Sequence, residues 1–451
     1  MTSTMHNIAR ILGVPVPTGQ DAAITGWSID SRTVQAGDAF FAIAGPNHDG
    51  HDHLQGAFDR GAALVVISKP AAASGPALRV ENTETALQTL AAAMRRSWDG
   101  IVVAVTGSAG KTSTKDAIAT LCAAQFKTGR TIGNLNNHLG LPLSILRLAD
   151  DAQVAVLEMG MNHAGEIRAL AEIAKPDVGA VTNVGWAHAE NFPEGIDGVA
   201  LAKRELIEAL GAGGTAILNA DDARVADFAQ IHPGRTICYG FAEQASVRAE
   251  NLVMTSNGAT FHALGQDFDS PLAGRHSVSN TLAAIAVARA LGIAAEKLPA
   301  AVRNLAAGHM RGERSEHGGV TIVNDCYNSN PEAARSMLEL LRGIPARRHI
   351  AVLGEMLELG REAESLHRGT GKFAAGGAVD VLVGIRGAAR FMVDEALKSG
   401  MSDGAAIFFD TPEQAGQFIR TVAQPGDAVL FKGSRGVQVE RALAQFVGTG
   451  N

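Results

Sequence analysis

A glycine-rich segment at residues 106–113, with the sequence T-G-S-A-G-K-T-S, carries the clearest chemical signal in the chain. It follows a β-branched run and opens a helix-like stretch, which is the context that a phosphate-binding loop requires. Gly107 and Gly110 let backbone N–H groups turn towards phosphate oxygens, and the helix N-terminus adds positive potential. Lys111 would neutralise the β and γ phosphates, so the segment predicts a bound nucleoside triphosphate.

One position departs from the strict pattern G-x-x-x-x-G-K-[ST], which requires glycine where this chain has Val105. The alternative is a glycine-rich strand-to-helix turn with a solvated lysine. We favour the phosphate loop because a strand and a helix flank the segment, and because the hydroxyl of Thr112 is suited to Mg²⁺. The residues expected to contact the nucleotide here are Gly107, Ser108, Ala109, Gly110, Lys111, Thr112 and Ser113.

Two further side chains are candidate ligands of a bound Mg²⁺, which prefers oxygen ligands and usually keeps several waters. Glu158 follows the apolar run at residues 154–157, and His188 follows a second run at residues 178–182. Ligands of open α/β folds gather at the carboxyl ends of the strands, so both side chains should face one crevice. The ordinary alternatives are a capping or loop carboxylate for Glu158 and a lone histidine without a ligand for His188.

Lys203 lies in a helical stretch at residues 198–209. From the residues alone, the simpler interpretation is a solvated lysine that forms ion pairs on the helix face with Glu205 or Glu208. A catalytic role for Lys203 therefore depends on further argument.

Composition restricts the class of protein. The 451 residues are 46% hydrophobic and 19% charged, as in an ordinary folded protein. The formal net charge of −7 offers no basic surface, so a nucleic-acid partner is not expected. Length alone suggests two to four domains, and three is our estimate.

No targeting or membrane segment is expected. Residues 1–13 lack the apolar core of a signal peptide, and the apolar stretch at residues 281–295 falls short of the roughly 20 residues that span a bilayer. A buried helix is the better prediction for that stretch. The three cysteines are far apart and form no C-x-x-C pair, which is typical of a reducing cytoplasm. We expect a cytoplasmic monomer.

Strand and helix patterns predict how these residues are positioned. Up to residue 98 the chain mixes short apolar runs with turns, which indicates a small α/β domain. Repeated strand–helix units then predict a central, mostly parallel sheet, and a third α/β segment from Arg314 looks Rossmann-like. The expected fold is α/β with three domains at residues 1–98, 99–313 and 314–451. The predicted strands are residues 101–105, 154–157, 178–182 and 215–218, then 320–323, 349–353, 379–383 and 428–431.

The order of motifs along essentially the whole chain resembles the Mur ligase family. Each motif alone could be an ordinary turn, cap or loop, but independent turns have no reason to follow one family's order. The resembling segments are S-I-D-S-R at 28–32, A-G-D-A-F-F-A at 36–42, H-D-G-H-D at 48–52, G-N-L-N-N-H-L-G-L-P at 133–142, L-E-M-G-M-N-H at 157–163, A-K-R-E-L at 202–206, H-S-V-S-N at 276–280, N-D-C-Y-N-S-N-P at 324–331 and K-G-S-R at 432–435.

The resemblance implies roles for individual residues. Lys111, Glu158, His188 and Lys203 are implied to be catalytic, with Lys203 carbamylated so that it binds a second Mg²⁺. The implied metal ligands are Thr112, Glu158, His188 and Lys203. The resemblance also implies that Asn280 contacts the adenine, Asp325 the ribose and Tyr327 the region near the base. A phosphate contact is implied for Arg311, with Arg314 as the alternative. The implied substrate-binding residues are Ser28, Asp30, Ser31, Arg32, Asp49, Gly50, Asn134, Asn136, Asn137, Asn162, His163, Lys432, Ser434 and Arg435.

The resemblance also implies a reaction. ATP would activate the carboxylate of UDP-N-acetylmuramoyl-tripeptide as an acyl phosphate, and D-alanyl-D-alanine would displace phosphate to give the pentapeptide precursor of peptidoglycan. Residues 133–142 favour this member over sister ligases that add a single amino acid or glutamate. Other hypotheses are a P-loop NTPase that drives a partner, and a non-catalytic UDP-sugar-binding protein, which the intact Lys111 and Thr112 disfavour. The third residue of the acceptor peptide, diaminopimelate or lysine, stays open.

Two positions depart from the family pattern. Ser277 stands where the family often has asparagine, and Cys326 stands where serine or alanine is more usual. We therefore assign no role to either residue.

Overall fold

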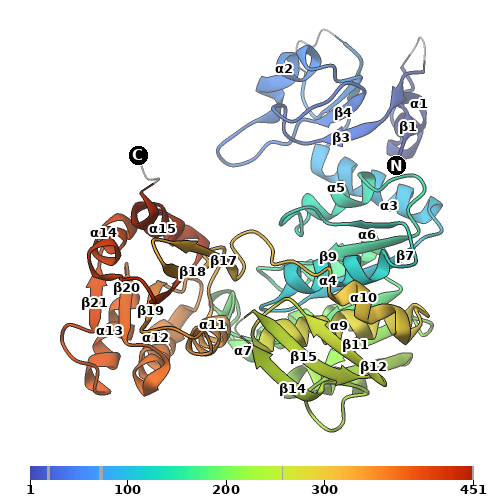
Figure 1. The fold of residues 1–451 in the computed structure, drawn as a ribbon. Coiled ribbons are helices and arrows are strands. Elements are labelled where there is room, and N and C mark those ends of the chain that lie inside the picture. The colour runs from blue at the N-terminus through green and yellow to red at the C-terminus, as the bar shows by residue number, and fades with distance from the viewer. Residues whose placement is uncertain (18–20, 71–74, 256, 449–451) are drawn as a thin grey trace.

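Three α/β units follow one another along the chain, each built around its own mainly parallel sheet (Figure 1). The computed structural model describes residues 1–17, 21–70, 75–255 and 257–448. The predicted three-domain α/β class is confirmed. No helix in these described stretches is long and apolar enough to cross a membrane.

The N-terminal unit has a four-stranded parallel sheet in the order β3-β4-β5-β6. A short antiparallel pair, β1 with β2, lies beside it. The long helix α3 begins at an Asn82 cap, and its buried face packs on α5 and α6 of the next unit. The elements are β1 Ser3–Thr4, α1 Met5–Leu12, β2 Ala23–Ile24, β3 Gly26–Ser28, β4 Asp38–Phe41, η1 Gly50–His53, α2 Leu54–Asp59, β5 Leu64–Ile67, β6 Ala77–Arg79 and α3 Thr83–Ser97.

The central unit has a seven-stranded sheet in the order β13-β12-β11-β10-β7-β9-β8, with every neighbouring pair parallel. Its strands are β7 Ile101–Thr106, β8 Thr128–Arg130, β9 Val154–Glu158, β10 Val178–Val181, β11 Thr215–Asn219, β12 Arg235–Gly240 and β13 Val247–Arg248. Its helices are α4 Lys111–Cys122, α5 Gly140–Leu146, α6 Glu166–Ala174, η2 Ala189–Asn191, α7 Ile196–Glu208, α8 Ala223–Ala226, η3 Asp227–Gln230, α9 Arg275–Ala290, η4 Ala295–Lys297 and α10 Leu298–Val302. The buried helix predicted at residues 281–295 corresponds to most of α9, which ends five residues earlier.

A separate antiparallel sheet, which the sequence did not suggest, covers one side of the central unit. It consists of β14 Glu250–Thr255, β15 Gly258–Ala263 and β16 Gln266–Ser270. The rings of Phe261 and Phe268 stack across β15 and β16 with centroids 5.2 Å apart, and both are buried in the core that α9 shares with the main sheet.

The C-terminal unit has a six-stranded sheet in the order β17-β18-β22-β19-β20-β21. Only β17, at the edge, is antiparallel to its neighbour; the other four pairs are parallel. The elements are β17 Glu313–His317, β18 Val320–Asp325, α11 Pro331–Arg342, β19 His349–Gly354, η5 Gly360–Glu362, α12 Ala363–Phe373, η6 Ala374–Ala378, β20 Val381–Ile385, α13 Ala389–Lys398, β21 Ala406–Phe409, α14 Pro412–Val422, β22 Ala428–Lys432, η7 Arg435–Val437 and α15 Glu440–Val447.

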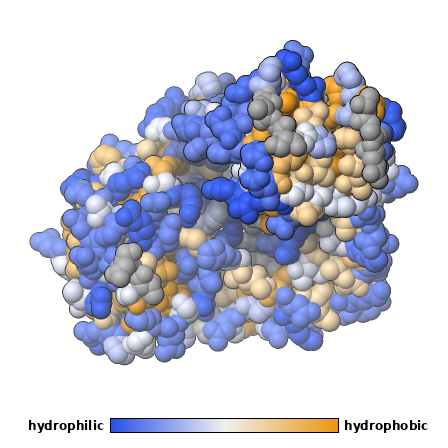
Figure 2. Space-filling view, turned by 90° about the horizontal axis from the view of Figure 1, so that it is seen from above, coloured by the Kyte–Doolittle hydropathy of each residue, from blue (hydrophilic) through white to orange (hydrophobic). Residues whose placement is uncertain are grey.

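The surface seen from above is mainly hydrophilic and is hollowed between the units (Figure 2). The predicted strands 101–105, 154–157, 178–182 and 215–218 lie in β7, β9, β10 and β11, and those of the third unit lie in β18, β19, β20 and β22. Because the strands of each main sheet run in parallel, the residues that follow them collect at one edge, and the candidate site lies there.

Candidate functional site

A cavity of about 830 Å³ lies between the central and C-terminal units and collects most of the predicted site residues. Its wall includes the loop before α4, the end of β9, α7 and α9 from the central unit, and the end of β18 and the start of α11 from the C-terminal unit. The predicted residues that line it are Ser108, Ala109, Gly110, Lys111, Thr112, Ser113, Asn134, Asn136, Asn137, Glu158, Asn162, His188, Lys203, Asn280, Arg311, Asp325, Tyr327 and Lys432.

The loop between β7 and α4 has the backbone of a phosphate-binding turn. Gly107 and Gly110 have φ of +150° and +79°, conformations that side chains disfavour. A Cβ at Gly107 would lie 1.8 Å from Thr182 Oγ1, and one at Gly110 would lie 2.7 Å from the side-chain oxygen of Asn280. Glycine is therefore required at both positions, and the departure at Val105 is accommodated inside β7 rather than in the turn.

Lys111 opens α4 and bends back over this loop, where its Nζ donates a hydrogen bond to the carbonyl of Gly107 at 2.7 Å. Burial lowers the pKa of Lys111, while the nearby carboxylate of Glu158 acts in the opposite direction. An anionic phosphate in the cavity would give this half-buried cation the counter-charge that favours its protonated form.

Glu158, the last residue of β9, is 2% exposed and is held on both sides. Its Oε2 accepts a hydrogen bond from Thr112 Oγ1 at 2.8 Å, and its Oε1 accepts one from Asn136 Nδ2 at 2.8 Å. The hydroxyl and the carboxylate that are candidates for Mg²⁺ therefore already touch. The alternative of a capping or solvated loop carboxylate is wrong for Glu158.

The hydroxyl of Thr112 and the carboxylate of Glu158 suit Mg²⁺ better than a metal ion whose ligands all come from the protein. Within the described residues, no group of three or more His, Cys, Asp and Glu side chains is placed to hold a metal. Mg²⁺ is usually held by one or two carboxylates, retained waters and substrate phosphates. One carboxylate and one hydroxyl beside a phosphate loop meet that requirement.

Lys203 is buried in α7, 2% exposed, and the interpretation of a solvated lysine with helix-face ion pairs is wrong. Its two supposed partners are engaged elsewhere: Glu205 accepts backbone N–H groups of Gly165 and Arg168, and Glu208 pairs with the side chains of Arg168 and Arg204. No hydrogen bond or ion pair joins the side-chain nitrogen of Lys203 to any residue that the structure describes. Burial, assisted by the charge of Lys111, lowers the pKa of Lys203 well below the usual value.

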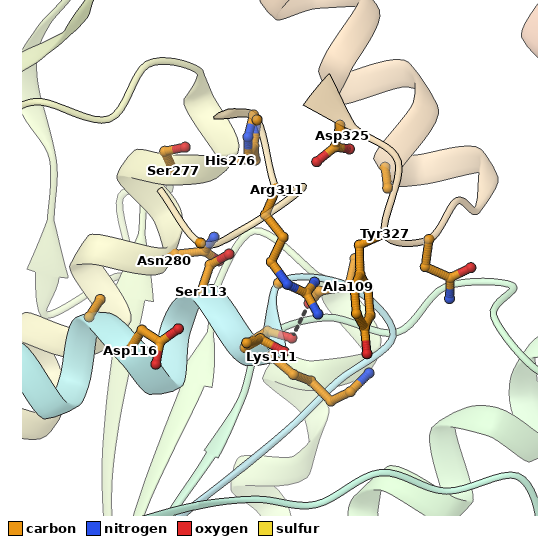
Figure 3. Close-up of a pocket in the computed structure, with 18 of the residues that line it drawn as sticks. Ala109, Lys111, Ser113, Asp116, His276, Ser277, Asn280, Arg311, Asp325 and Tyr327 are labelled. Atoms are coloured by element: carbon orange, nitrogen blue, oxygen red, sulfur yellow. Dashed lines mark hydrogen bonds between the residues drawn. The ribbon is translucent and has the colours of Figure 1, made fainter. Parts of the chain in front are cut away.

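Arg311 and Tyr327 lie side by side in the wall of the cavity (Figure 3). The guanidinium of Arg311 lies 3.9 Å from the centre of the Tyr327 ring, and Asn280 of α9 faces them from the central unit. Of the two candidate arginines, Arg311 lines the cavity, whereas Arg314 lies outside the lining in β17. A planar cation stacked on a ring suits a heteroaromatic base.

Asp325 and Lys432 meet at the ends of β18 and β22, where their charged atoms are 2.6 Å apart. Lys432 Nζ also donates to the carbonyl of Asn328 at 2.8 Å and is buried. The neighbouring loop residues lie outside the cavity lining: Ser434 is buried and bonded to Leu357 N, and Arg435 pairs with Glu440.

The predicted residues of the N-terminal unit are not part of this cavity. Arg32 pairs with Asp30 at 2.7 Å, which lowers the pKa of Asp30 to about 2. Asp49 accepts from His51 and contacts Lys69, and these contacts hold its pKa far below the usual range. Outside the cavity lining lie Ser28, Asp30, Ser31, Arg32, Asp49 and Gly50 of this unit, and also Gly107, His163, Ser434 and Arg435.

Several cavity residues were missed. Asn183 brackets the phosphate loop: its Oδ1 accepts from Ala109 N at 2.8 Å and its Nδ2 donates to Ala109 O at 3.0 Å. Its position directly after the strand predicted at 178–182 was an available signal. His276, at the start of α9, is half-buried, and its Nδ1 is buried and unpartnered within the described part of the chain; no spacing in the sequence indicated this.

Lys115, one turn beyond Lys111, is also buried. Its Nζ donates to the carbonyl of Thr131 at 2.8 Å and lies 3.5 Å from that of Gly133. It thereby ties α4 to the segment that carries Asn134, Asn136 and Asn137. Lysine in this place positions the asparagines relative to the phosphate loop.

We expect Lys115→Met to destabilise the protein by about 1–3 kcal/mol, because the buried carbonyl of Thr131 loses its donor. Thermal and denaturant-induced unfolding measure the change. The matched control is Lys127→Met, which removes an exposed lysine that pairs with Asp151 and should change stability by no more than about 0.5 kcal/mol. Equal stabilities of the two variants would contradict the assignment.

Models of one protein family match three successive segments of the chain. The chain matches models described as the Mur ligase family catalytic domain at residues 23–95, the Mur ligase middle domain at 105–288 and the Mur ligase glutamate ligase domain at 310–435. The UDP-N-acetylmuramoyl-tripeptide–D-alanyl-D-alanine ligase of Bacillus subtilis strain 168 is 31% identical over 98% of each chain.

Two solved structures are similar over nearly the whole chain. The crystal structure of MurF from Acinetobacter baumannii has a TM-score of 0.89 and 28% identity, covering 99% of each chain. The structure of MurF ligase from Thermotoga maritima in complex with ADP has a TM-score of 0.82 and 30% identity, covering 94% of this chain and 97% of that one. The chain belongs to the Mur ligase family.

Proposed function

We propose that this protein is the ATP-dependent ligase that joins D-alanyl-D-alanine to UDP-N-acetylmuramoyl-tripeptide and forms the pentapeptide precursor of peptidoglycan. The observation that carries the proposal is the meeting of Lys111, Glu158 and the buried Lys203 in one cavity between two units. The full-length similarity to ligases named for this reaction supports the choice of substrates.

ATP would lie with its phosphates in the loop of Gly107 to Ser113 and its base near Tyr327 and Arg311. The 3.9 Å stack of these two side chains, with Asn280 opposite, supports that orientation. Thr112, Glu158, His188 and a carbamate on Lys203 would hold two Mg²⁺ ions, which supply charge neutralisation for the phosphates when they are bound.

The first step transfers a phosphoryl group. An oxygen of the tripeptide's terminal carboxylate attacks the γ phosphorus, the bond to the β-phosphate oxygen breaks, and ADP leaves. The products are an acyl phosphate and ADP. Lys111 and the backbone N–H groups of its loop stabilise the charge that develops on the phosphate oxygens.

The second step forms the amide. The amino group of D-alanyl-D-alanine attacks the acyl carbon, a tetrahedral intermediate forms and loses a proton from nitrogen, and phosphate leaves. Water would hydrolyse the acyl phosphate, so the cavity must exclude it during the reaction. A site walled by two separate units can do so by closing.

The other parts of the proposal concern the whole chain. We assign residues 1–98 to binding of the UDP-sugar-peptide through Ser28, Asp30, Ser31, Arg32, Asp49 and Gly50, residues 99–313 to ATP, and residues 314–451 to the incoming dipeptide and closure. Asn134, Asn136, Asn137, Asn162, His163, Lys432, Ser434 and Arg435 would complete the substrate contacts. We also propose a cytoplasmic monomer.

A phosphate-release assay with each substrate omitted in turn tests the function. We expect release to require ATP, the UDP-tripeptide and D-alanyl-D-alanine together, with one phosphate for each pentapeptide formed. Release that continues without the dipeptide would instead indicate an NTPase. Amide formation with a single amino acid or glutamate, and none with the dipeptide, would indicate a sister ligase.

A further inference from the structure

The turn after β19 docks directly on the segment of the central unit that carries His188. Glu358 Oε2 lies 2.5 Å from His188 Nδ1, and the carbonyl of Glu358 accepts a hydrogen bond from Glu190 N at 3.2 Å. Gly360 lies so close that a Cβ there would be 2.9 Å from Glu190 Cα. The contact therefore involves both side chains and backbone, and it joins two units.

Both partners hold unusual backbone conformations at this contact. Glu358 has φ of +65° and His188 has φ of +64°, in the left-handed region that residues other than glycine rarely adopt. Such conformations persist only where the surroundings determine them, and they concentrate at functional sites. The turn is also anchored from behind, because Met356 and Leu359 are buried and pack with Trp186 of the central unit.

The chemistry of an imidazole ligand explains why a carboxylate would be placed here. A histidine that binds a metal through one ring nitrogen commonly has the other held by a carboxylate, carbonyl or water, which fixes the tautomer and the ring orientation. Glu358 occupies the Nδ1 side and leaves Nε2 as the nitrogen available to a ligand. His188 lines the cavity that contains Glu158 and Thr112.

The pairing is close but is not aligned as a regular hydrogen bond, since Nδ1 of His188 has no partner of hydrogen-bond geometry within the described residues. Rotation of the ring would align Nδ1 of His188 with Glu358 Oε2 as a hydrogen bond. The proton on Nδ1 would then point at Glu358, and the lone pair would be on Nε2.

We propose that Glu358 is a positioning residue that the C-terminal unit contributes to the metal site of the central unit. Docking of the 355–362 turn orients His188, so the metal-binding set is complete only when the two units are in contact. The inference rests on the proposed function only in taking His188 as a Mg²⁺ ligand. It links domain arrangement to metal affinity and hence to the order of events in the reaction.

Binding of Mn²⁺, as a spectroscopic substitute for Mg²⁺, to the full-length protein with ADP tests this inference. Electron paramagnetic resonance of free Mn²⁺ gives the affinity without any turnover. We expect Glu358→Gln, which keeps the shape of the side chain, to weaken Mn²⁺ binding by about 10- to 100-fold, the range seen when outer partners of metal ligands are removed.

The matched control is Glu362→Gln in the same turn. The carboxylate of Glu362 pairs with its neighbours Arg361 and Ser365, so this variant should leave Mn²⁺ affinity unchanged. A double-mutant cycle distinguishes a positioning role of Glu358 from an ordinary ion pair at the interface. In a His188→Ala background, Glu358→Gln should have no further effect on Mn²⁺ affinity.

Wild-type affinity in Glu358→Gln, or an equal loss with and without His188, would overturn the inference. A thermal unfolding midpoint for each variant shows whether a loss reflects damage to the fold. Failure of the proposed function is recognised separately, because it would appear in the wild-type protein as phosphate release that does not depend on D-alanyl-D-alanine.

Discussion

Lys111→Ala should lower kcat for phosphate release by about 10²- to 10³-fold, the cost of removing one preorganised group that stabilises transition-state charge. Lys111 Nζ lies in the loop where we propose that the phosphates bind, 2.7 Å from the carbonyl of Gly107. Its charge matters most as negative charge develops on the transferred phosphoryl group, so kcat should fall more than the affinity for ADP. Steady-state kinetics with all three substrates and titration with ADP measure the two effects.

Lys127→Ala is the control for Lys111→Ala. Lys127 is exposed and pairs with Asp151 outside the cavity, so its loss should leave kcat unchanged. A kcat for Lys111→Ala within a few-fold of the wild-type value would contradict the role of the loop in catalysis, even if ATP were still bound. Lys111→Arg should rescue little, because the planar guanidinium does not replace a compact ammonium inside a tight loop.

The parts of the site that lie close together in the chain were predictable from the sequence. The phosphate loop depends on two glycines, a lysine and the strand and helix that flank them, all within residues 101–124. Glu158 was predictable because an apolar run ends immediately before it, and the end of a parallel strand fixes which edge of the sheet it occupies. Local spacing is sufficient for such features.

Contacts between distant segments were not predictable in this way. His188 and Glu358 are far apart in the chain and meet only because two units dock, so neither position carries a sign of the other. For Lys203, local spacing gave a wrong prediction. Its neighbours Glu205 and Glu208 suggested helix-face ion pairs, but α6 packs against α7, and Gly165 and Arg168 take up those carboxylates.

The apolar pattern by which strands were predicted is also absent from some strands or misleading in them. β17 consists of Glu313 to His317, E-R-S-E-H, and has no apolar residue. It is a strand because its backbone pairs with β18 at the sheet edge, where polar side chains can face solvent. β14 differs, because it carries the apolar run Leu252 to Met254 although it is exposed along most of its length, so its hydrophobic residues do not mark a buried strand.

Lys203→Ala should lower kcat by about 100-fold or more. The variant lacks the carbamate anion that would help to hold Mg²⁺ at the phosphates, and stabilisation of transition-state charge by the metal is worth several kcal/mol. Lys203 faces the cavity, is buried, and has a pKa lowered by burial and by the charge of Lys111. A lowered pKa leaves the amine neutral at a pH at which a solvated lysine is protonated. The neutral amine can attack CO₂: a nitrogen–carbon bond forms as one C–O π bond opens, a proton passes from nitrogen to solvent, and the neutral amine becomes a carbamate anion.

Direct detection separates the carbamate from a purely structural role of Lys203. Protein equilibrated with ¹³C-bicarbonate should give a carbamate ¹³C resonance that is absent from Lys203→Ala and from Lys203→Arg. Added bicarbonate should not restore either variant, because neither retains the amine, whereas Lys203→Glu, which supplies a carboxylate, should recover part of kcat. Full activity in Lys203→Ala would remove the carbamate from the mechanism. A variant that loses activity while the wild-type protein lacks the resonance would leave Lys203 acting as an amine, and the second metal site would then need a different ligand.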